Sequence, residues 1–249
     1  MATIRILSYN IHKGLTPANR RFVLERMRTA IRSVDAEVVF LQEVQGQHHK
    51  RAARFADWPI EGQCEYLADS IWSHHAYGKN ALYDHGHHGN AILSRFGFVS
   101  FSNEDVSDHR YERRGLLHSV VAVPGWRRNL HCVCVHLSLH QGGRNRQLEA
   151  ISGRLQEIAS HDLPIVVAGD FNDWRHRATS ILERRLGMTE VSVAHAGRAP
   201  RTYPSLLPLL RLDRIYVRGF DVAASRVHGG RPWSMLSDHL AVSAELRRG

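Results

Sequence analysis

Short apolar runs, each bounded by polar or turn-forming residues, recur from one end of the chain to the other. Runs of about four to eight apolar or alternating residues are typical of β-strands. The pattern predicts nine strands, over Thr3–Tyr9, Val38–Leu41, Asn90–Leu93, Val99–Phe101, Leu116–Val123, Asn129–His136, Ile165–Ala168, Arg211–Val217 and Leu240–Glu245.

Three other segments repeat their apolar residues with the spacing of a helix face. They are Arg20–Val34, Arg144–Ala159 and Thr179–Leu186, the last followed by Gly187 as a C-cap. A block of consecutive strands between helical segments favours mixed sheets over a parallel βαβ barrel. We expect an α/β protein in which two packed sheets carry helices on their outer faces, in a single domain over residues 1–249.

Composition is that of an ordinary globular protein, with 43% hydrophobic and 23% charged residues among 249. No apolar run approaches the roughly 18 to 20 residues that span a bilayer, and the first residues resemble a strand rather than a signal peptide. We therefore expect a cytoplasmic monomer. Cys64, Cys132 and Cys134 lack metal-site spacing and are expected to be buried free thiols.

The formal charge of +9 comes almost entirely from arginine, because lysine occurs only at Lys13, Lys50 and Lys79. Arginine binds phosphate in bidentate fashion, and basic domains attract nucleic acid or anionic lipid head groups. A basic surface without a specific partner explains the charge equally well. Charge alone therefore selects no function.

Polar side chains that could bind a metal or act in catalysis stand where the predicted strands end. Asp170 and Asn172 leave the apolar run Ile165–Ala168 two residues apart, so on an extended backbone they point the same way. The other strand-end residues are Asn10, Glu43, His136, Asp213, Asp238 and His239. Singly, each has an ordinary role as a turn, helix-start or ion-pair residue. Together they predict an oxygen-rich site for a hard divalent cation, with acid–base groups beside it.

Carboxylate and amide oxygens favour Mg²⁺, or Mn²⁺, over a closed zinc site. The histidine pairs His48-His49, His74-His75 and His87-His88 do not have the spacing of zinc ligands on a helix. We expect them in solvated loops, with the exception that His88 lines the site because it adjoins Gly89 and Asn90.

Six short motifs occur in one order along the chain: Ser8-Tyr9-Asn10-Ile11, Leu41-Gln42-Glu43-Val44, His136-Leu137, Gly169-Asp170-Phe171-Asn172-Asp173, Leu212-Asp213-Arg214-Ile215 and Ser237-Asp238-His239. This order resembles the endonuclease/exonuclease/phosphatase superfamily, which includes DNase I, exonuclease III-type AP endonucleases, neutral sphingomyelinases and inositol polyphosphate 5-phosphatases. The resemblance implies a DNase I-like four-layer α/β/β/α sandwich, two packed mixed β-sheets flanked by helices. It also implies Mg²⁺-dependent attack of water on phosphorus.

The same resemblance implies a role for each residue. Asp170 would orient or deprotonate the attacking water, and Asn172 would hold a phosphate oxygen. His239 would stabilise the negative charge of the transition state, oriented by Asp238 and supported by Asp213 from outside the site. The metal would be held by Glu43, with Asn10 and Asp238 nearby.

His136 distinguishes between branches of the superfamily. The Val133–Leu137 segment resembles the histidine-containing strand end of DNase I, sphingomyelinases and 5-phosphatases, whereas AP endonucleases carry an asparagine pattern there. The sequence is therefore interpreted as a bacterial stand-alone member nearer the sphingomyelinase/phosphodiesterase side. Asn90 and His88 are further candidates for substrate binding. Arg114 either grips a substrate phosphate or is a loop arginine exposed to water.

The leading hypothesis is a Mg²⁺-dependent phosphodiesterase or phosphatase that acts on a phospholipid head group or small phosphoester. A nonspecific DNA or RNA nuclease is the second hypothesis, and a catalytically inactive binding module is a remote third. The lipid hypothesis allows peripheral contact with an anionic membrane. Four tryptophans are candidates for insertion there: Trp58, Trp72, Trp126 and Trp233.

Overall fold

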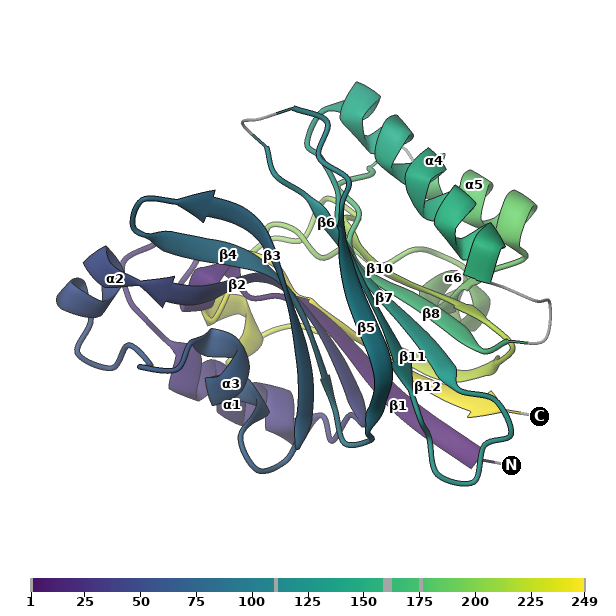
Figure 1. The fold of residues 1–249 in the computed structure, drawn as a ribbon, viewed down its shortest axis with the longest axis horizontal. Helices are drawn as coiled ribbons and strands as arrows, with labels where there is room; N and C mark the ends of the chain where they lie inside the picture. The colour runs from purple at the N-terminus through teal and green to yellow at the C-terminus, as the bar shows by residue number, and fades with distance from the viewer. Residues whose placement is uncertain (1, 110–111, 159–162, 175–176, 249) are drawn as a thin grey trace.

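Two six-stranded sheets dominate the computed structural model, which describes residues 2–109, 112–158, 163–174 and 177–248 (Figure 1). In order across the first sheet lie β11 (Asp221–His228), β12 (Ala241–Arg248), β1 (Ala2–Asn10), β2 (Val38–His48), β4 (Gly86–Ser94) and β3 (His74–Tyr83). In order across the second lie β5 (Phe98–Asp105), β6 (Gly115–Val121), β7 (Leu130–His136), β8 (Ile165–Asp170), β10 (Asp213–Arg218) and β9 (Thr189–Glu190). Both sheets are mixed, since β1 pairs parallel to β2 and β7 parallel to β8.

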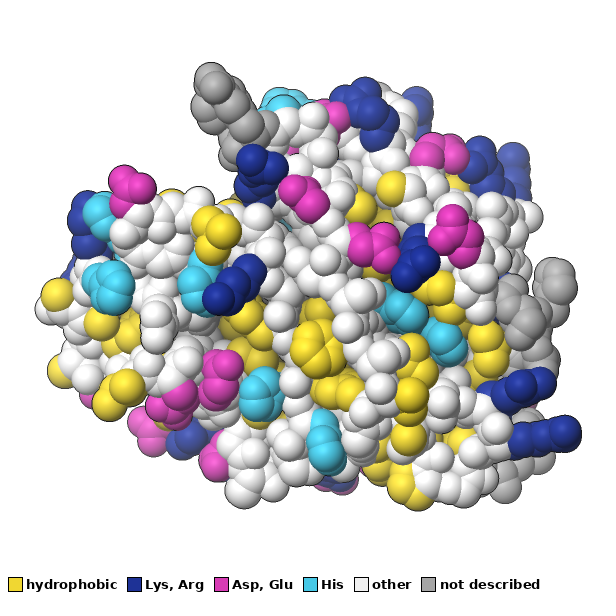
Figure 2. Space-filling view, in the orientation of Figure 1, with side chains coloured by type: hydrophobic (Ala, Val, Ile, Leu, Met, Phe, Trp, Pro, Cys, Tyr) yellow, Lys and Arg dark blue, Asp and Glu magenta, His cyan; other side chains and the backbone are white. Residues whose placement is uncertain are grey.

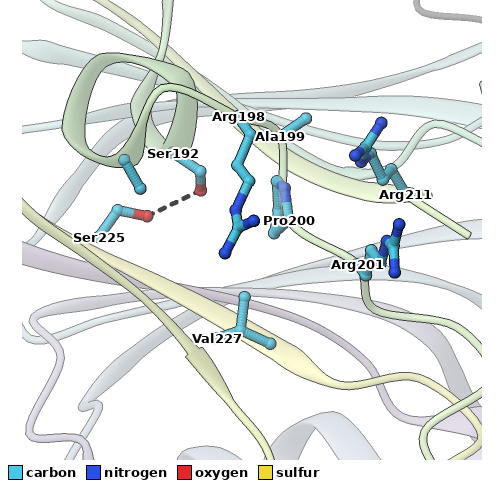
Figure 3. A pocket seen from close by; sticks show the side chains of 9 residues that line it. Ser192, Arg198, Ala199, Pro200, Arg201, Arg211, Ser225 and Val227 are labelled. Atoms are coloured by element: carbon cyan, nitrogen blue, oxygen red, sulfur yellow. Dashed lines mark hydrogen bonds between the residues drawn. The ribbon is translucent and has the colours of Figure 1, made fainter. Parts of the chain in front are cut away.

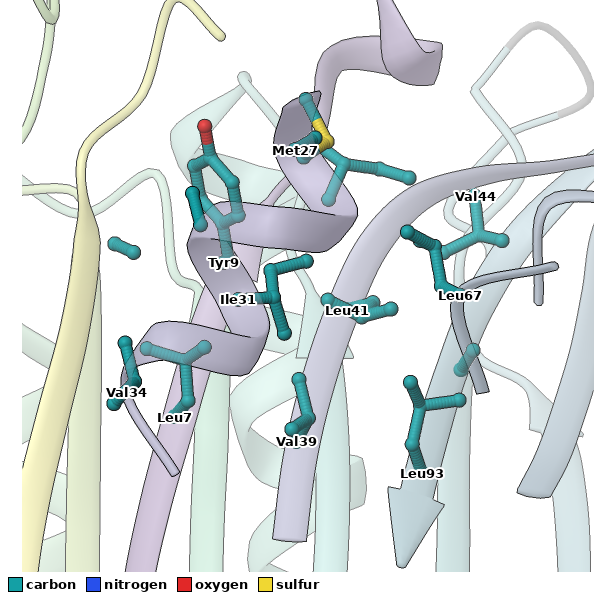
Figure 4. Close-up of a cluster of buried hydrophobic side chains, with 14 of the residues drawn as sticks. Leu7, Tyr9, Met27, Ile31, Val34, Val39, Leu41, Val44, Leu67 and Leu93 are labelled. Carbon is teal, nitrogen blue, oxygen red and sulfur yellow. The ribbon is translucent and has the colours of Figure 1, made fainter. Parts of the chain in front are cut away.

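Alternation along the central strands fills two cores at once. In β1, Ile4 and Ile6 face the second sheet, whereas Leu7 and Tyr9 belong to a cluster on the opposite face. Figure 4 shows the cluster that contains Leu7 and Tyr9, where α1 (Leu24–Ser33) packs over β1 and β2. A strand buried on both faces reads as a continuous apolar run, which explains why these strands were predicted.

Helices cover the outer face of each sheet. On the first sheet, α1 and α3 (Gln63–Ala68) contribute to the outer core, and a short helix, α2 (His49–Arg54), follows β2. On the second sheet, α4 (Gln141–Ile158) and α5 (Arg177–Leu186) pack against β7 and β8. A sixth helix, α6 (Val191–Ala196), contacts β10 and β11. The expected four-layer α/β/β/α sandwich is confirmed.

Several local predictions were wrong. The strands β3, β9 and β11 and the helices α2, α3 and α6 were not predicted, and of the helix expected over Arg144–Ala159, Ala159 lies outside the described residues. The histidine pairs do not lie in loops, since His48 ends β2, His74 begins β3 and His88 lies within β4. Backbone pairing along an edge strand needs no apolar run, so such strands leave little trace in the sequence.

Three of the four tryptophans expected at a membrane are buried inside the protein, and the fourth, Trp126, is partly buried. Trp72 is fully buried, Trp58 and Trp233 are less than a tenth exposed, and Trp126 packs against the inter-sheet core. The three cysteines are free and buried, as expected. Within the described part of the chain, every helix is too short or too polar to cross a lipid bilayer.

Hydrophobic side chains are visible on the surface as well. On the face shown in Figure 2 they gather around β3 and β5, where Val99 and Phe101 are more than half exposed. Lysine and arginine side chains lie dispersed over this face, some at its edge and some within it. The excess positive charge therefore does not form a single patch on this side of the molecule.

Candidate active site

Strand register places three candidate residues in one row across the second sheet. His136 of β7 is the partner of Asp170 of β8, and Asp170 is in turn the partner of Asp213 of β10. Because residues directly opposite one another on neighbouring strands project from the same face, the three side chains share one face of the sheet. From the other sheet, the end of β1 adds Asn10 to this row: its side-chain amide donates to Asp170 Oδ2 at 3.1 Å.

Asp170 is the centre of the cluster. Its Oδ2 lies 3.4 Å from His136 Nε2 and 3.7 Å from His239 Nε2, and its Oδ1 accepts from the backbone N–H of Asn172 at 3.0 Å. The side chain is almost completely buried. Burial raises the pKa of the Asp170 carboxyl to about 6, although the His239 charge acts in the opposite direction.

His239 is held by a different acid from the one expected. Its Nδ1 lies 2.8 Å from Asp213 Oδ2, whereas Asp238, expected to orient it, pairs through Oδ1 with His12 Nδ1 at 3.0 Å. Burial alone would lower the pKa of His239, but the Asp213 and Asp170 carboxylates outweigh it and raise that pKa to about 10. His239 is therefore an imidazolium whose orientation is set by Asp213.

His136, unlike His239, is neutral. Burial and the nearby Arg114 lower the pKa of His136 well below its usual range. Two histidines thus face one carboxylate oxygen, one of them charged and the other neutral. This is a pair whose environments push their pKa values apart, an arrangement common where acid and base roles are divided.

Glu43 lies at a break in the pairing of β2 with β4. The register shifts between Leu41 and Val44, and Glu43 has a positive φ of 56°. Such a bulge re-aims a side chain, and a positive φ in a non-glycine residue is a strained conformation that recurs at functional sites. Glu43 Oε2 lies 2.8 Å from Lys13 Nζ. Burial opposes the charged form, but Lys13 outweighs it and holds the pKa of Glu43 well below its usual range.

Asn172 reaches the site by a turn rather than by an extended strand. Its φ of 48° shows that the chain has left β8, so the expectation of two side chains aligned along one strand was wrong. The turn instead brings its backbone N–H to Asp170, while its side-chain amide donates to the carbonyl of Leu137 at 2.9 Å. Asn172 therefore links the end of β8 to the residue after His136.

The donor set suits a hard cation. Glu43 and Asp238 offer carboxylate oxygens around the short 3₁₀ turn His12–Gly14, and Asn10 offers an amide oxygen that accepts from the N–H of His12 at 3.1 Å. Ligand atoms of Asp170, Asp213 and His239 also lie within 4.8 Å of one another. In that group His239 Nδ1 already pairs with Asp213 Oδ2, just as Glu43 pairs with Lys13 and Asp238 with His12.

The residues expected to bind substrate occupy unlike environments. Asn90 is buried, and its amide donates to the carbonyls of Gly115 at 3.0 Å and Cys134 at 3.4 Å. Its amide nitrogen thus bridges the two sheets, while its Oδ1 has no hydrogen-bond partner in the described part of the chain, and its role in substrate binding stays a prediction. His88 lines a pocket of about 570 Å³ beside the site, and burial together with Lys13 lowers the pKa of His88 to about 4.

Arg114 lines the same pocket. It is not an exposed loop arginine, since its side chain is only 12% exposed. Its guanidinium lies 2.9 Å from Glu112 Oε1 and donates to the carbonyl of Leu137 at 3.3 Å. Arg114 can therefore meet a phosphate only as part of this Glu112–Arg114 pair.

Three residues of the site were given no role from sequence. His12 and Lys13 pair with the two carboxylates above, and the ring of Tyr203 lies 4.9 Å from that of His239. The available signal was that His12 and Lys13 lie two and three residues after Asn10. Tyr203 lies far from His239 in sequence, so nothing local indicated their contact.

Known proteins share the family and the fold of this chain. Residues 7–239 match the Endonuclease/Exonuclease/phosphatase family. The protein YbhP of Escherichia coli (strain K12) is 43% identical over 244 residues, covering 98% of this chain and 96% of the relative.

Solved structures share the fold at low identity. An endonuclease/exonuclease/phosphatase from Beutenbergia cavernae superposes with a TM-score of 0.82 at 22% identity, covering 100% of this chain and 72% of that one. D. rerio TDP2 complexed with a single-strand DNA product gives 0.74 at 17% identity, covering 99% and 100%. With its DNase I-like sandwich and a family match over nearly its whole length, the chain belongs to the Endonuclease/Exonuclease/phosphatase family of phosphoester hydrolases.

Proposed function

We propose that this protein hydrolyses a phosphodiester by direct attack of water on phosphorus at the Asp170 cluster. The observation that carries the proposal is the convergence of His136 and His239 on one oxygen of a buried carboxylate, at 3.4 and 3.7 Å. A carboxylate flanked by two imidazoles can hold a water molecule while hydrogen-bond donors stand ready for phosphate oxygens.

Each side chain then has a distinct task. Asp170 orients the water and accepts its proton. The backbone N–H of Asn172 and the side-chain amide of Asn10 hold the Asp170 carboxylate in place. His239, kept positively charged by Asp213, stabilises the negative charge that develops on the phosphoryl oxygens. His136 hydrogen-bonds a nonbridging or leaving oxygen.

The metal belongs beside these groups. Glu43, Asp238 and Asn10 would hold Mg²⁺, or Mn²⁺, whose charge neutralises phosphate oxygens when it is bound. Lys13 and His12, now paired with Glu43 and Asp238, would then be free to contact the substrate.

For the substrate we favour a phospholipid head group or another small phosphodiester. His136 at the end of β7 supports this choice, because the histidine-containing strand end resembles the sphingomyelinase and phosphodiesterase side of the superfamily. Purified protein should hydrolyse bis-p-nitrophenyl phosphate and a phospholipid with Mg²⁺ but not with EDTA. His239→Ala should abolish both activities, and no hydrolysis of any phosphoester by the folded protein would refute the proposal in favour of an inactive binding module.

A nuclease remains the second candidate, because TDP2 with a single-strand DNA product shares the fold and the chain carries a charge of +9. Phosphate contacts make such binding steeply salt-dependent. Plasmid nicking and single-strand cleavage, measured from low to physiological salt, test it. Cleavage of DNA at rates above those on lipid would replace the lipid proposal with this one.

A further inference from the structure

An exposed cluster of leucines projects from the segment between Tyr203 and Leu210, here called the leucine hairpin (residues 203–210). Leu206, Leu207 and Leu209 are 67%, 66% and 58% exposed, and Leu210 is 39% exposed. The hairpin is a defined structure, since the N–H groups of Leu209 and Leu210 both donate to the carbonyl of Tyr203, at 2.8 and 2.7 Å. Large aliphatic side chains held outward in this way mark a surface that meets another apolar phase.

The base of the hairpin is joined to the active site. The Ser205 N–H donates to the carbonyl of Asp238 at 2.7 Å, and the Tyr203 ring packs against His239. Just before the hairpin, Thr202 Oγ1 accepts from the N–H of Asp213 at 3.2 Å. Whatever the leucines contact is therefore held beside the reacting groups.

Arginines lie on the two chain segments that lead into and out of the hairpin. Arg198, Arg201 and Arg211 line a pocket of about 400 Å³ between the segment after α6 and strand β11. In Figure 3 the three side chains lie along the pocket, with Arg198 extending toward Val227 and with Arg201 and Arg211 together at one end. Arg201 precedes the hairpin by two residues and Arg211 follows it directly. Guanidinium groups flanking an apolar tip are complementary to phosphate groups above a hydrocarbon layer.

We propose that the leucine hairpin docks this enzyme on an anionic phospholipid bilayer. The leucines enter the boundary between head groups and acyl chains, while the arginines at the base contact lipid phosphates. The inference rests on the proposed function in one respect, namely that the substrate is a lipid phosphodiester. The hairpin would then be the surface through which the active site reaches that lipid. The leucine hairpin, and not the tryptophans considered from the sequence, is then the element that contacts the membrane.

Vesicle co-sedimentation of the full chain tests the docking without turnover. The wild type should sediment with phosphatidylglycerol vesicles, and Leu206→Asp/Leu207→Asp should weaken that binding at least about tenfold, because burial of leucine drives insertion. Val99→Asp/Phe101→Asp is the matched control: it places the same two charges on two similarly exposed apolar residues of β5. Wild-type protein left in the supernatant, or equal loss in the control, would overturn the proposal.

Substitution of the arginines gives a second, independent test of the docking. Arg198→Ala/Arg201→Ala should weaken binding to phosphatidylglycerol vesicles and reduce its salt dependence, with little change on phosphatidylcholine vesicles. Equal binding of the wild type to both lipids would refute the electrostatic part. A wild-type dimer that the leucine variant dissociates, seen by light scattering, would instead make the hairpin a contact between two copies of this chain.

Turnover separates this inference from the proposed function. Because the leucines do not touch the reacting groups, Leu206→Asp/Leu207→Asp should hydrolyse bis-p-nitrophenyl phosphate at the wild-type rate, which also shows that it folds. Its rate on phosphatidylglycerol vesicles should fall with its binding. Vesicle binding without any lipid hydrolysis would refute the proposed substrate and leave the docking surface standing.

Discussion

His239 and Asp213 form a buried pair in which the imidazole Nδ1 donates to the carboxylate Oδ2 at 2.8 Å. An ionised carboxylate only accepts hydrogen bonds, so the proton must lie on Nδ1. The ring's other nitrogen is thereby aimed at Asp170. Asp213 is in this sense a positioning residue, acting on the site through His239.

Asp213→Asn keeps the shape of this pair but removes its charge. We expect kcat to fall by about 10²- to 10⁴-fold with KM nearly unchanged, because the imidazolium loses its stabilising partner while the binding groups remain. Steady-state kinetics on bis-p-nitrophenyl phosphate measure both constants. Asp221→Asn, at an exposed position of β11, is the control and should behave as wild type. A loss in kcat below about tenfold would contradict the role given to Asp213.

Glu43→Gln should weaken metal binding. Removing one carboxylate from an oxygen donor set lowers its affinity for a hard cation, and we expect the Mg²⁺ concentration for half-maximal activity to rise at least about tenfold. Mg²⁺ should also raise the thermal midpoint of the wild type, and less so that of the variant. Glu65→Gln, an exposed carboxylate 3.9 Å from His75, is the control. Identical Mg²⁺ titrations for Glu43→Gln and the wild type would place the metal elsewhere.

Glu190 predicts a pH-dependent loss of stability away from the active site. Its side chain is buried at the start of α6, where it accepts from the N–H of Val193, and burial raises the pKa of its carboxyl to about 7 from the ordinary value of 4.5. The folded state therefore holds its proton more tightly than the unfolded state. The contribution of protonated Glu190 to folding stability is fully present below about pH 4.5 and is lost as the pH rises through 7.

Glu190→Gln removes that titration. Urea unfolding at several pH values should show the variant gaining stability relative to wild type between about pH 4.5 and 8, with no gain at the acid end. The difference between the two proteins is the informative quantity, since other groups titrate equally in both. A difference that is constant with pH would mean that Glu190 is ionised normally.

Phe40→Ala tests the core between the sheets. Phe40 is fully buried there, so its removal leaves a cavity and should cost about 3 to 5 kcal/mol of unfolding free energy. Phe101→Ala, on the exposed face of β5, should cost less than about 1 kcal/mol. Denaturant unfolding of both variants gives the comparison, and similar losses would contradict the assignment of Phe40 to the core.

Burial decided most of the sequence predictions, although three residues of the exposed edge strand β5, Val99–Phe101, were also predicted. β1, β2 and β8 are buried on both faces, so their apolar runs identified them directly. β3 and β11 are edge strands with partly exposed side chains, and they were missed. An edge strand is stabilised chiefly by backbone hydrogen bonds to one neighbour, which leave no consistent side-chain pattern.

By itself, the sequence determined the central strands of the two sheets, which polar residues stand at their ends, and the family those residues indicate. Only the tertiary structure decided how they pair: Asp213 with His239, Asp238 with His12, and Asn90 across the two sheets. It also placed an exposed leucine hairpin against Asp238. Apolar periodicity is a local property of the chain, whereas these contacts join segments far apart in sequence and depend on sheet register and packing.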